Sequence, residues 1–258
     1  GNAVAGIHLS NGSNLIITAE SDGHSLTVTG GGNSDIYGYA GTGIGKNPQE
    51  EGNATLKIEG GNVTANGGKT TGYWGVSADG IGKNVVEGLS NLTIDISGGN
   101  IETTGENSPW LGYGGNGING IVRIKGGSVT ARGKSSGFDI TGNVTIEGGT
   151  ITDCVFRVEV IIKSGTFTNC TFYGETTVQG GTFTKCRFER VAIIKSGTFT
   201  NSYFGGDTTV LDGTFTNNTF SGKSFLMNKG TINNEDGSRI TSKEIIVNSG
   251  EITITFPK

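Results

Sequence analysis

One ten-residue motif occurs four times with a fixed spacing of sixteen residues. It reads GTFTNCTFYG from Gly165, and the later copies begin at Gly181, Gly197 and Gly213. Every copy keeps the Thr-Phe-Thr triplet. A short period of this kind indicates a solenoid, in which each repeat buries its apolar side chains against the next repeat. The motif therefore argues against most compact globular folds.

The repeat that contains the first copy predicts three short strands with corners between them. Side chains alternate across a strand, so Val160 and Ile162 should point inward on the first strand. By the same alternation Phe167 points inward between two outward threonines, and Cys170 and Phe172 point inward after a turn. Stacked coils of this type form a parallel β-helix, in which the backbone of each rung hydrogen-bonds to the next rung.

An apolar column of this kind can be followed through the whole chain. It runs through Leu26, Val63, Ile101, Val129, Ile151, Phe167, Phe183, Phe199, Phe215, Ile232 and Ile252. The spacing is 37 residues at the start and 16 in the middle, which indicates that the early coils carry inserted loops. We therefore expect an all-β, single-stranded parallel β-helix of about eleven coils. Insertions at one corner favour a right-handed coil.

The spacing also divides the expected single domain into three parts. Residues 1–146 form coils with long loop insertions, residues 147–223 form regular sixteen-residue coils, and residues 224–258 form closing coils. The last rung is expected near Glu251–Phe256, where apolar and polar residues alternate.

Composition agrees with this fold and narrows the function. The chain has 48 glycines in 258 residues, and they separate short β-branched runs, which favours turns over helices. The net charge is −4 and there is no basic run, so nucleic acid is not an expected partner. No apolar stretch is long enough to span a membrane, and we expect no membrane insertion. There is no signal peptide, but we expect Gly1 to be a processed start, which leaves secretion open.

The three cysteines fall on the repeat lattice. Cys154, Cys170 and Cys186 are sixteen residues apart, and Ser202 and Asn218 continue the same column. One interpretation is a redox or metal site. We favour a buried ladder of small side chains, because free cysteine is commonly buried and because serine and asparagine fill equivalent positions. We predict no metal site and no cofactor.

The outward threonines of the motif form a second regular array. The pairs are Thr150/Thr152, Thr166/Thr168, Thr182/Thr184, Thr198/Thr200 and Thr214/Thr216. Over residues 150–216 this lattice resembles the ice-binding faces of β-helical antifreeze proteins. Upstream, Glu102 would interrupt such a plane. Threonine also has high β-propensity and suits any solvated strand face, and a contact with glycan is a third interpretation.

Aromatic residues that fit no interior column lie in the inserted loops. A Gly-Ile dipeptide recurs every 37 residues, at Gly6, Gly43, Gly80 and Gly117, and a loop precedes each later copy. The loops contain Tyr37, Tyr39, Tyr73, Trp74, Trp110 and Tyr113. We expect the loops to leave the same corner of successive coils and to cluster. With Asp79 and Asn116 nearby, the rings could bind a sugar; alternatively, they pack over the coil edge.

The residue pattern does not predict catalysis. A polysaccharide lyase or hydrolase needs clustered or paired carboxylates. The outward column after the first strand is instead a mixture that includes Glu59, Ser97, Lys125, Glu147 and Lys163. The nearest approach to an acidic cluster, which could hold calcium weakly, is Asp79, Asn116 and Asp139. We predict no catalytic residue and no enzymatic activity.

Two glycine-rich stretches carry a family resemblance. DGIGKN…NLTIDISGGNIETTG and GNGINGIVRIKGGSVTARG resemble repetitive extracellular proteins of gut Firmicutes and Bacteroidetes. They are also similar to the carbohydrate-binding, pectate-lyase-like β-helix proteins of clostridia. The resemblance covers about residues 1–150. It implies a right-handed β-helix, a secreted or cell-surface location, and glycan binding or adhesion without turnover.

Together these features predict a secreted or cell-surface, non-catalytic and monomeric module. Its expected partner is a polysaccharide, or a host or cell-wall glycan, bound through the aromatic loops. The first alternative is a structural stalk or adhesin segment of a larger surface protein. A polysaccharide lyase or hydrolase and an ice-binding protein are the remaining alternatives.

Overall fold

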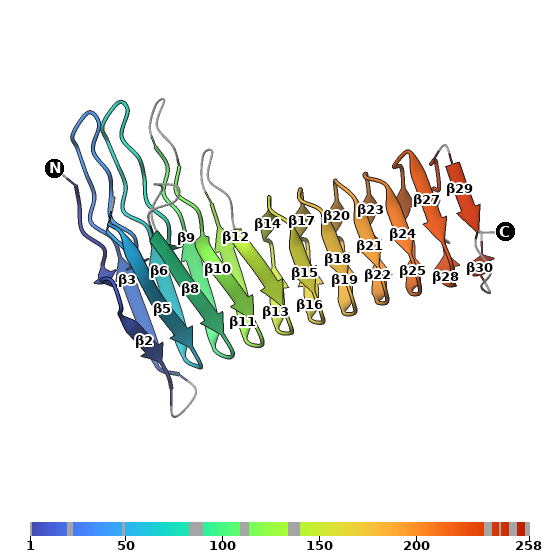
Figure 1. The fold of residues 1–258 in the computed structure, drawn as a ribbon, viewed down its shortest axis with the longest axis horizontal. Helices are drawn as coiled ribbons and strands as arrows, with labels where there is room; N and C mark the ends of the chain where they lie inside the picture. The colour runs from blue at the N-terminus through green and yellow to red at the C-terminus, as the bar shows by residue number, and fades with distance from the viewer. Residues whose placement is uncertain are drawn as a thin grey trace. The chain divides into compact units, whose positions relative to one another are not determined.

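The chain is built from parallel strands. The computed structural model describes residues 2–19, 23–47, 50–82, 90–108, 114–133, 140–234, 239–242, 244–247 and 252–255. Every regular element within these residues is a β-strand (Figure 1). The chain divides into two compact units, Gly1–Val144 and Thr145–Lys258. Both units consist of stacked coils with parallel pairing, which confirms the predicted parallel β-helix. In the described part of the chain, no helix is long and apolar enough to cross a membrane.

The first unit has two parallel sheets. One contains β1 (Ile7–His8), β2 (Asn14–Ile17), β4 (Ile44–Gly45), β5 (Gly52–Ile58), β7 (Ile81–Gly82), β8 (Ser90–Ile96) and β10 (Ile118–Ile124), with β12 (Ile140–Ile146) after them in the chain. The other contains β3 (Ser25–Thr29), β6 (Asn62–Asn66), β9 (Asn100–Thr104) and β11 (Ser128–Arg132).

The Gly-Ile markers fix the coil period of this unit. Ile44 lies opposite Ile7 on one side and opposite Ile81 on the other, and Ile81 lies opposite Ile118. The 37-residue spacing is therefore one full coil. Glycine is needed at Gly43, since a Cβ there would come within 2.5 Å of the carbonyl oxygen of Gly80 in the next coil.

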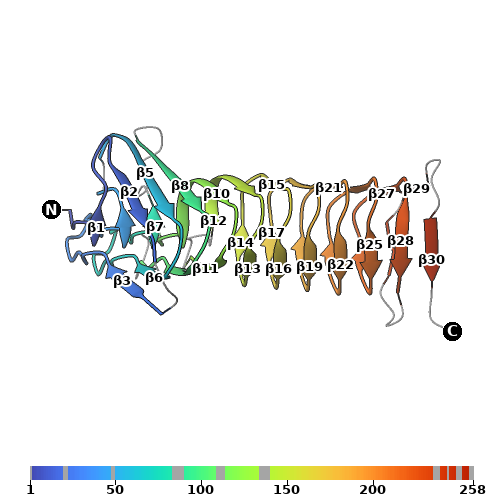
Figure 2. The ribbon, with the colours of Figure 1, turned by 90° about the horizontal axis from the view of Figure 1, so that it is seen from below.

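The second unit repeats three ranks of strands along its coils (Figure 2). The first rank contains β13 (Thr150–Thr152), β16 (Thr166–Thr168), β19 (Thr182–Thr184), β22 (Thr198–Thr200), β25 (Thr214–Thr216), β28 (Gly230–Asn233) and β30 (Ile252–Thr255). The second contains β15 (Val160–Ile162), β18 (Thr176–Val178), β21 (Ala192–Ile194), β24 (Thr208–Val210), β27 (Ser224–Met227) and β29 (Glu244–Val247). The third contains β14 (Val155–Phe156), β17 (Thr171–Phe172), β20 (Arg187–Phe188), β23 (Tyr203–Phe204) and β26 (Thr219–Phe220).

The side-chain directions predicted for one coil are confirmed. Val160, Ile162, Phe167, Cys170 and Phe172 are all fully buried. The threonines that flank the first phenylalanine point outward, one exposed and one half-buried. Because neighbouring coils pair residue for residue, each phenylalanine of the triplet lies opposite its equivalent.

Two ladders of phenylalanine rings fill the interior of this unit. In the first ladder, the Phe183 ring stacks on Phe167 and on Phe199, with both pairs of centroids 4.7 Å apart. In the second ladder, Phe188 and Phe204 stack at 4.8 Å. The two ladders meet edge to face, for example between Phe183 and Phe188 at 5.7 Å. Both geometries are the ones that aromatic pairs prefer.

The predicted last member of the apolar column is wrong. Ile232 lies opposite Ile254, whereas Ile252 lies opposite Gly230. Ile254 is also 42% exposed, so the column does not stay buried into the last described strand.

A polar column runs inside the second unit beside the rings. The cysteines begin it, and all three are free and buried; Ser202, Asn218 and Asn234 continue it and are also buried. The backbone N–H of Ser202 donates to Oδ1 of Asn218 at 2.7 Å, and the backbone N–H of Asn218 donates to Oδ1 of Asn234 at 3.1 Å. These side chains therefore satisfy backbone donors that face the interior.

One corner of every regular coil has a left-handed backbone. The residues there, with φ between 50° and 55°, are Asp153, Asn169, Lys185, Asn201 and Asn217. Asparagine and aspartate tolerate this conformation, while other residues with a Cβ strain it. Lys185 is thus the exception in the column.

Replacing Lys185 with asparagine should stabilise the protein. We expect the free energy of unfolding to rise by about 0.5–1 kcal/mol, because a left-handed φ is less strained for asparagine than for lysine. Urea unfolding followed by far-UV circular dichroism measures the change. Lys195→Asn is the control, since Lys195 is exposed and has no positive φ. An equal effect of the two substitutions would contradict the explanation.

Candidate functional site

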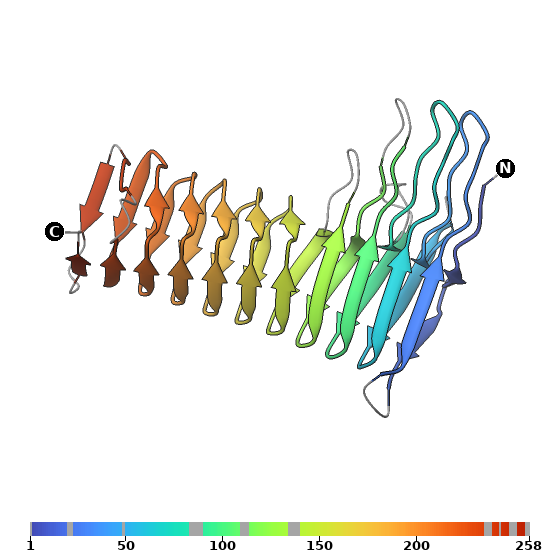
Figure 3. The same cartoon turned by 180° about the vertical axis from the view of Figure 1, so that it is seen from behind.

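The first two inserted loops of the first unit lie side by side (Figure 3). The Trp74 N–H donates to the carbonyl of Ile36 at 2.8 Å, and the Val76 N–H donates to the carbonyl of Gly38 at 3.0 Å. In both bonds the donor lies 38 residues after the acceptor, which is one 37-residue coil plus one residue. Because both bonds have the same spacing, the two loops run parallel to each other. The prediction that successive loops leave the same corner is confirmed for these two loops.

Each loop turns at an equivalent position. A backbone hydrogen bond closes a turn from Asp35 to Gly38 at 3.0 Å, and a second closes the turn from Gly72 to Gly75 at 3.1 Å. Glycine is required where each turn ends, because a Cβ on Gly38 would clash with the Asn33 side chain and a Cβ on Gly75 with the Thr70 side chain. The two central residues of each turn therefore project from the loop.

Those central residues are large, apolar and exposed. Ile36 and Tyr37 are 60% and 72% exposed, and Tyr73 and Trp74 are 47% and 45% exposed. The Tyr73 and Trp74 rings meet edge to face at 5.4 Å. We call these four residues the aromatic loop surface. Trp110 and Tyr113, predicted for the third loop, lie outside the described residues.

The start of the third loop lies against the second. The Ser108 hydroxyl donates to the carbonyl of Gly75 at 3.0 Å, and the Ser77 hydroxyl donates to the carbonyl of Asn107 at 2.6 Å. These bonds tie the second loop to its neighbour. The surface is therefore supported by fixed backbone rather than by isolated loop tips.

Three of the predicted site residues are half-buried or buried. Tyr39 is half-buried and pairs with Val76 of the next coil. Asp79 is fully buried, and its Oδ1 accepts hydrogen bonds from the backbone N–H and the side-chain amide of Asn116 at 2.8 and 2.9 Å. Its Oδ2 accepts one from the Asn119 amide at 3.1 Å. The two bonds to Oδ1 link Asp79, which precedes the Gly80-Ile81 marker, to Asn116, which precedes the Gly117-Ile118 marker of the next coil. Asp139 lies outside the described residues.

A depression borders the aromatic loop surface. Its volume is about 540 Å³, and Asn2, Ser34, Asp35, Ile36, Tyr37 and Gly38 line it. Hydroxyl, amide and carboxylate groups thus lie beside an exposed ring. Such a combination of an apolar face and polar edge groups matches a small polar ring compound.

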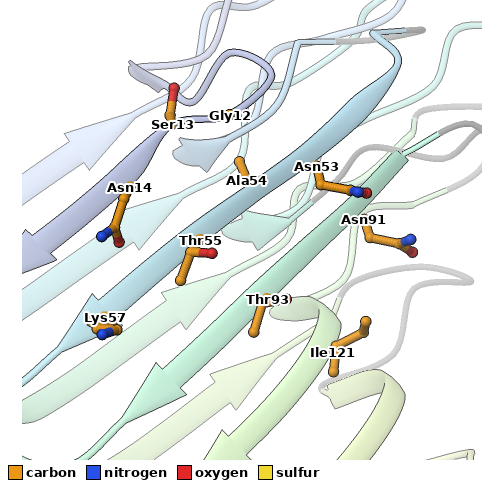
Figure 4. Close-up of a pocket in the computed structure, with 10 residues that line it drawn as sticks. All are labelled: Gly12, Ser13, Asn14, Asn53, Ala54, Thr55, Lys57, Asn91, Thr93 and Ile121. Carbon is orange, nitrogen blue, oxygen red and sulfur yellow. The ribbon is translucent and has the colours of Figure 1, made fainter.

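A second concave site, which the sequence pattern did not predict, crosses the outward face of β2, β5, β8 and β10 (Figure 4). We call it the polar trough. Its volume is about 520 Å³, and asparagine and threonine side chains dominate its lining. One signal could have revealed it: asparagine is rare in strands, yet Asn14, Asn53 and Asn91 occupy outward strand positions.

The cysteines are placed for packing. The Cys170 thiol is completely buried; its hydrogen bond with the Cys186 thiol, followed by burial, raises its pKa. A raised pKa keeps the thiol protonated and unreactive near neutral pH. No group of three or more metal-ligating side chains is gathered in the described part of the chain.

The Thr-x-Thr array is regular in the second unit. In each of β13, β16, β19, β22 and β25 the first threonine is exposed and the second is half-buried, and the pairs of neighbouring coils lie opposite one another. The predicted threonine lattice is thus present over these five strands. Comparisons with protein-family models, with curated proteins and with solved structures find no match to this chain.

Proposed function

We propose that this protein is a non-catalytic module that binds polysaccharide through the aromatic loop surface. One observation carries the proposal: two consecutive loops, held in parallel by backbone hydrogen bonds, present Tyr37, Tyr73 and Trp74 to solvent. Large rings left exposed on a rigid support indicate a ligand surface, because burying them in the coil would have been favourable. Tyr39, by contrast, fits packing over the coil edge.

Carbohydrate is the ligand class that suits these side chains. Tyrosine and tryptophan combine an apolar face with a polar edge, which matches a sugar ring with its C–H face and equatorial hydroxyls. The adjacent depression adds the Ser34 hydroxyl and the Asp35 carboxylate as hydrogen-bonding groups. The proposal includes a secreted or cell-surface location and action as a monomer. The resemblance to pectate-lyase-like carbohydrate-binding proteins supports the same ligand class.

Removing the rings should abolish most of the binding. The double variant Tyr37→Ala/Trp74→Ala keeps the backbone hydrogen bonds of the loops but loses one ring from each turn. We expect its affinity for at least one glycan bound by the wild type to fall about tenfold or more, since each turn loses the ring whose face would lie against the sugar. A glycan array identifies the ligand, and isothermal titration calorimetry measures the affinity.

The matched control is Tyr173→Ala in the second unit. The Tyr173 ring is 42% exposed, and the Arg157 guanidinium lies 4.6 Å from its centroid. This variant should bind like the wild type. The proposal is contradicted if the wild type binds no glycan, or if the double variant binds every glycan on the array as well as the wild type does. Release of new reducing ends from a bound polymer would contradict the non-catalytic assignment.

A further inference from the structure

The polar trough is a site with an ordered lining. Asn14, Thr55, Thr93 and Ile121 lie opposite one another on successive strands and form one column. Asn53 lies opposite Asn91, two residues along the strands, and begins a second column (Figure 4). Neighbouring strands are about 4.8 Å apart. A chain laid across the strands would therefore meet an amide or hydroxyl on β2, β5 and β8, and the Ile121 side chain on β10.

The polar groups of this lining are available to a ligand. Asn14, Asn53 and Asn91 are exposed, and Thr55 and Thr93 are half-buried. Within the described residues, no hydrogen bond engages the side chains of these five residues. Asparagine contributes little to strand stability, and here it lies beside outward threonines whose hydroxyls are also unengaged in the described part of the chain.

One end of the trough is held rigidly. The Asn11 side-chain Oδ1 accepts a hydrogen bond from the Asn53 N–H at 2.9 Å, and the Gly12 N–H donates to the Asn53 carbonyl at 2.7 Å. The Ser13 N–H closes the turn by donating to the Ser10 carbonyl at 3.0 Å. These bonds fix the first coil against the second, so that a ligand would meet a preformed wall.

The charges near the trough favour an uncharged ligand. Lys57 is the charged side chain among the residues labelled in Figure 4. It lies opposite Asp95, whose carboxylate pairs with Lys125 at 3.1 Å. A polyanion has a carboxylate on each sugar unit, whereas the trough offers it only the Lys57 ammonium among its lining residues across four strands. Most of its carboxylates would therefore lie without a cationic partner from the lining. Amides and hydroxyls, which both donate and accept, instead match neutral hydroxyl groups.

We propose that the polar trough binds an uncharged, linear, hydroxyl-rich polymer, a neutral polysaccharide, laid across β2, β5, β8 and β10. Ile121, which is 41% exposed, provides an apolar contact at one end of the first column. The backbone groups of β5 and β8 already pair with strands on both sides. A peptide could not add to this face by strand pairing, and so recognition falls to the side chains. This site stands on its own residues, independently of the aromatic loop surface.

The test measures binding of neutral linear hexasaccharides of β-1,4-glucan, β-1,4-mannan and β-1,4-xylan, with hexagalacturonate as the acidic counterpart. We expect the wild type to bind at least one neutral hexasaccharide and to bind hexagalacturonate more weakly. The variant Thr55→Val/Thr93→Val removes two lining hydroxyls with little change in shape. It should weaken the neutral interaction about tenfold.

The control places the same substitutions on the other sheet of the same unit. Thr64 and Thr130 are half-buried outward residues of β6 and β11, and Thr64→Val/Thr130→Val should leave binding unchanged. Tyr37→Ala/Trp74→Ala should also keep hexasaccharide binding, which separates the two sites. The proposal is overturned if no neutral hexasaccharide binds, if hexagalacturonate binds more tightly, if the trough variant binds like the control, or if the loop variant alone loses binding.

Discussion

Replacing Phe183 with alanine is expected to lower the free energy of unfolding by about 3–5 kcal/mol. The ring is fully buried and stacks on Phe167 and Phe199, so that its removal leaves a cavity at the centre of a ladder. Urea unfolding followed by far-UV circular dichroism measures the loss. Hydrogen exchange should show faster amide exchange first in the strands β16, β19 and β22.

Two further variants define the origin of that effect. Thr182→Ala changes the exposed residue just before Phe183 on the same strand, and should alter stability by no more than about 0.5 kcal/mol. Phe183→Leu should cause a smaller loss than alanine, because leucine refills most of the space. A loss below about 1 kcal/mol for Phe183→Ala would show that the ladder does not stabilise the second unit.

Replacing Asn218 with alanine is also expected to lower the free energy of unfolding, by about 2–3 kcal/mol. Asn218 is fully buried; its Oδ1 accepts from the Ser202 N–H, and its amide donates to the carbonyls of Phe199 and Thr216 at 2.8 and 3.0 Å. Alanine leaves the Ser202 N–H buried without an acceptor. Equilibrium unfolding in urea measures the change.

Serine at the same position provides the discriminating variant. In the preceding coil the Ser202 hydroxyl accepts from the Cys186 N–H at 3.1 Å, so Asn218→Ser should restore an acceptor and recover part of the loss. Thr219→Ala, at a half-buried outward position in the next strand, should have little effect. If serine and alanine destabilise equally, the hydrogen bond to Ser202 is not the cause.

Most of the fold could be predicted because its signal is local. Alternation within a single coil was enough to place Phe167 and Phe172 inside, and the sixteen-residue period then placed their equivalents. Ile252 shows the limit of this reasoning. Ile252 and Ile254 are two residues apart on one strand and face the same side of the sheet, so alternation cannot choose between them. Which of them lies opposite Ile232 of β28 depends on the length of the connection that precedes β30.

The candidate sites were harder to predict because they depend on relations between coils. The residue pattern left open whether the rings of Tyr37 and Trp74 are exposed or packed over the coil edge, and it did not predict that Asp79 is buried. A glycine at position 82 leaves room for the Asp79 carboxylate, since a Cβ there would clash with it. The polar trough combines residues about 38 and 28 positions apart, and its columns become visible only when the register of the strands is known.

The sixteen-residue coil of the second unit also determines how this part of the chain responds to tension. Each coil touches chiefly the coils before and after it, so a pull on one end acts on a single rung at a time. Sixteen residues span about 53–58 Å when fully extended, while a rung occupies about 4.8 Å of the stack. Every coil that unfolds would therefore lengthen the chain by roughly 50 Å in one step. Under tension the unit would extend in a series of equal steps, one for each coil.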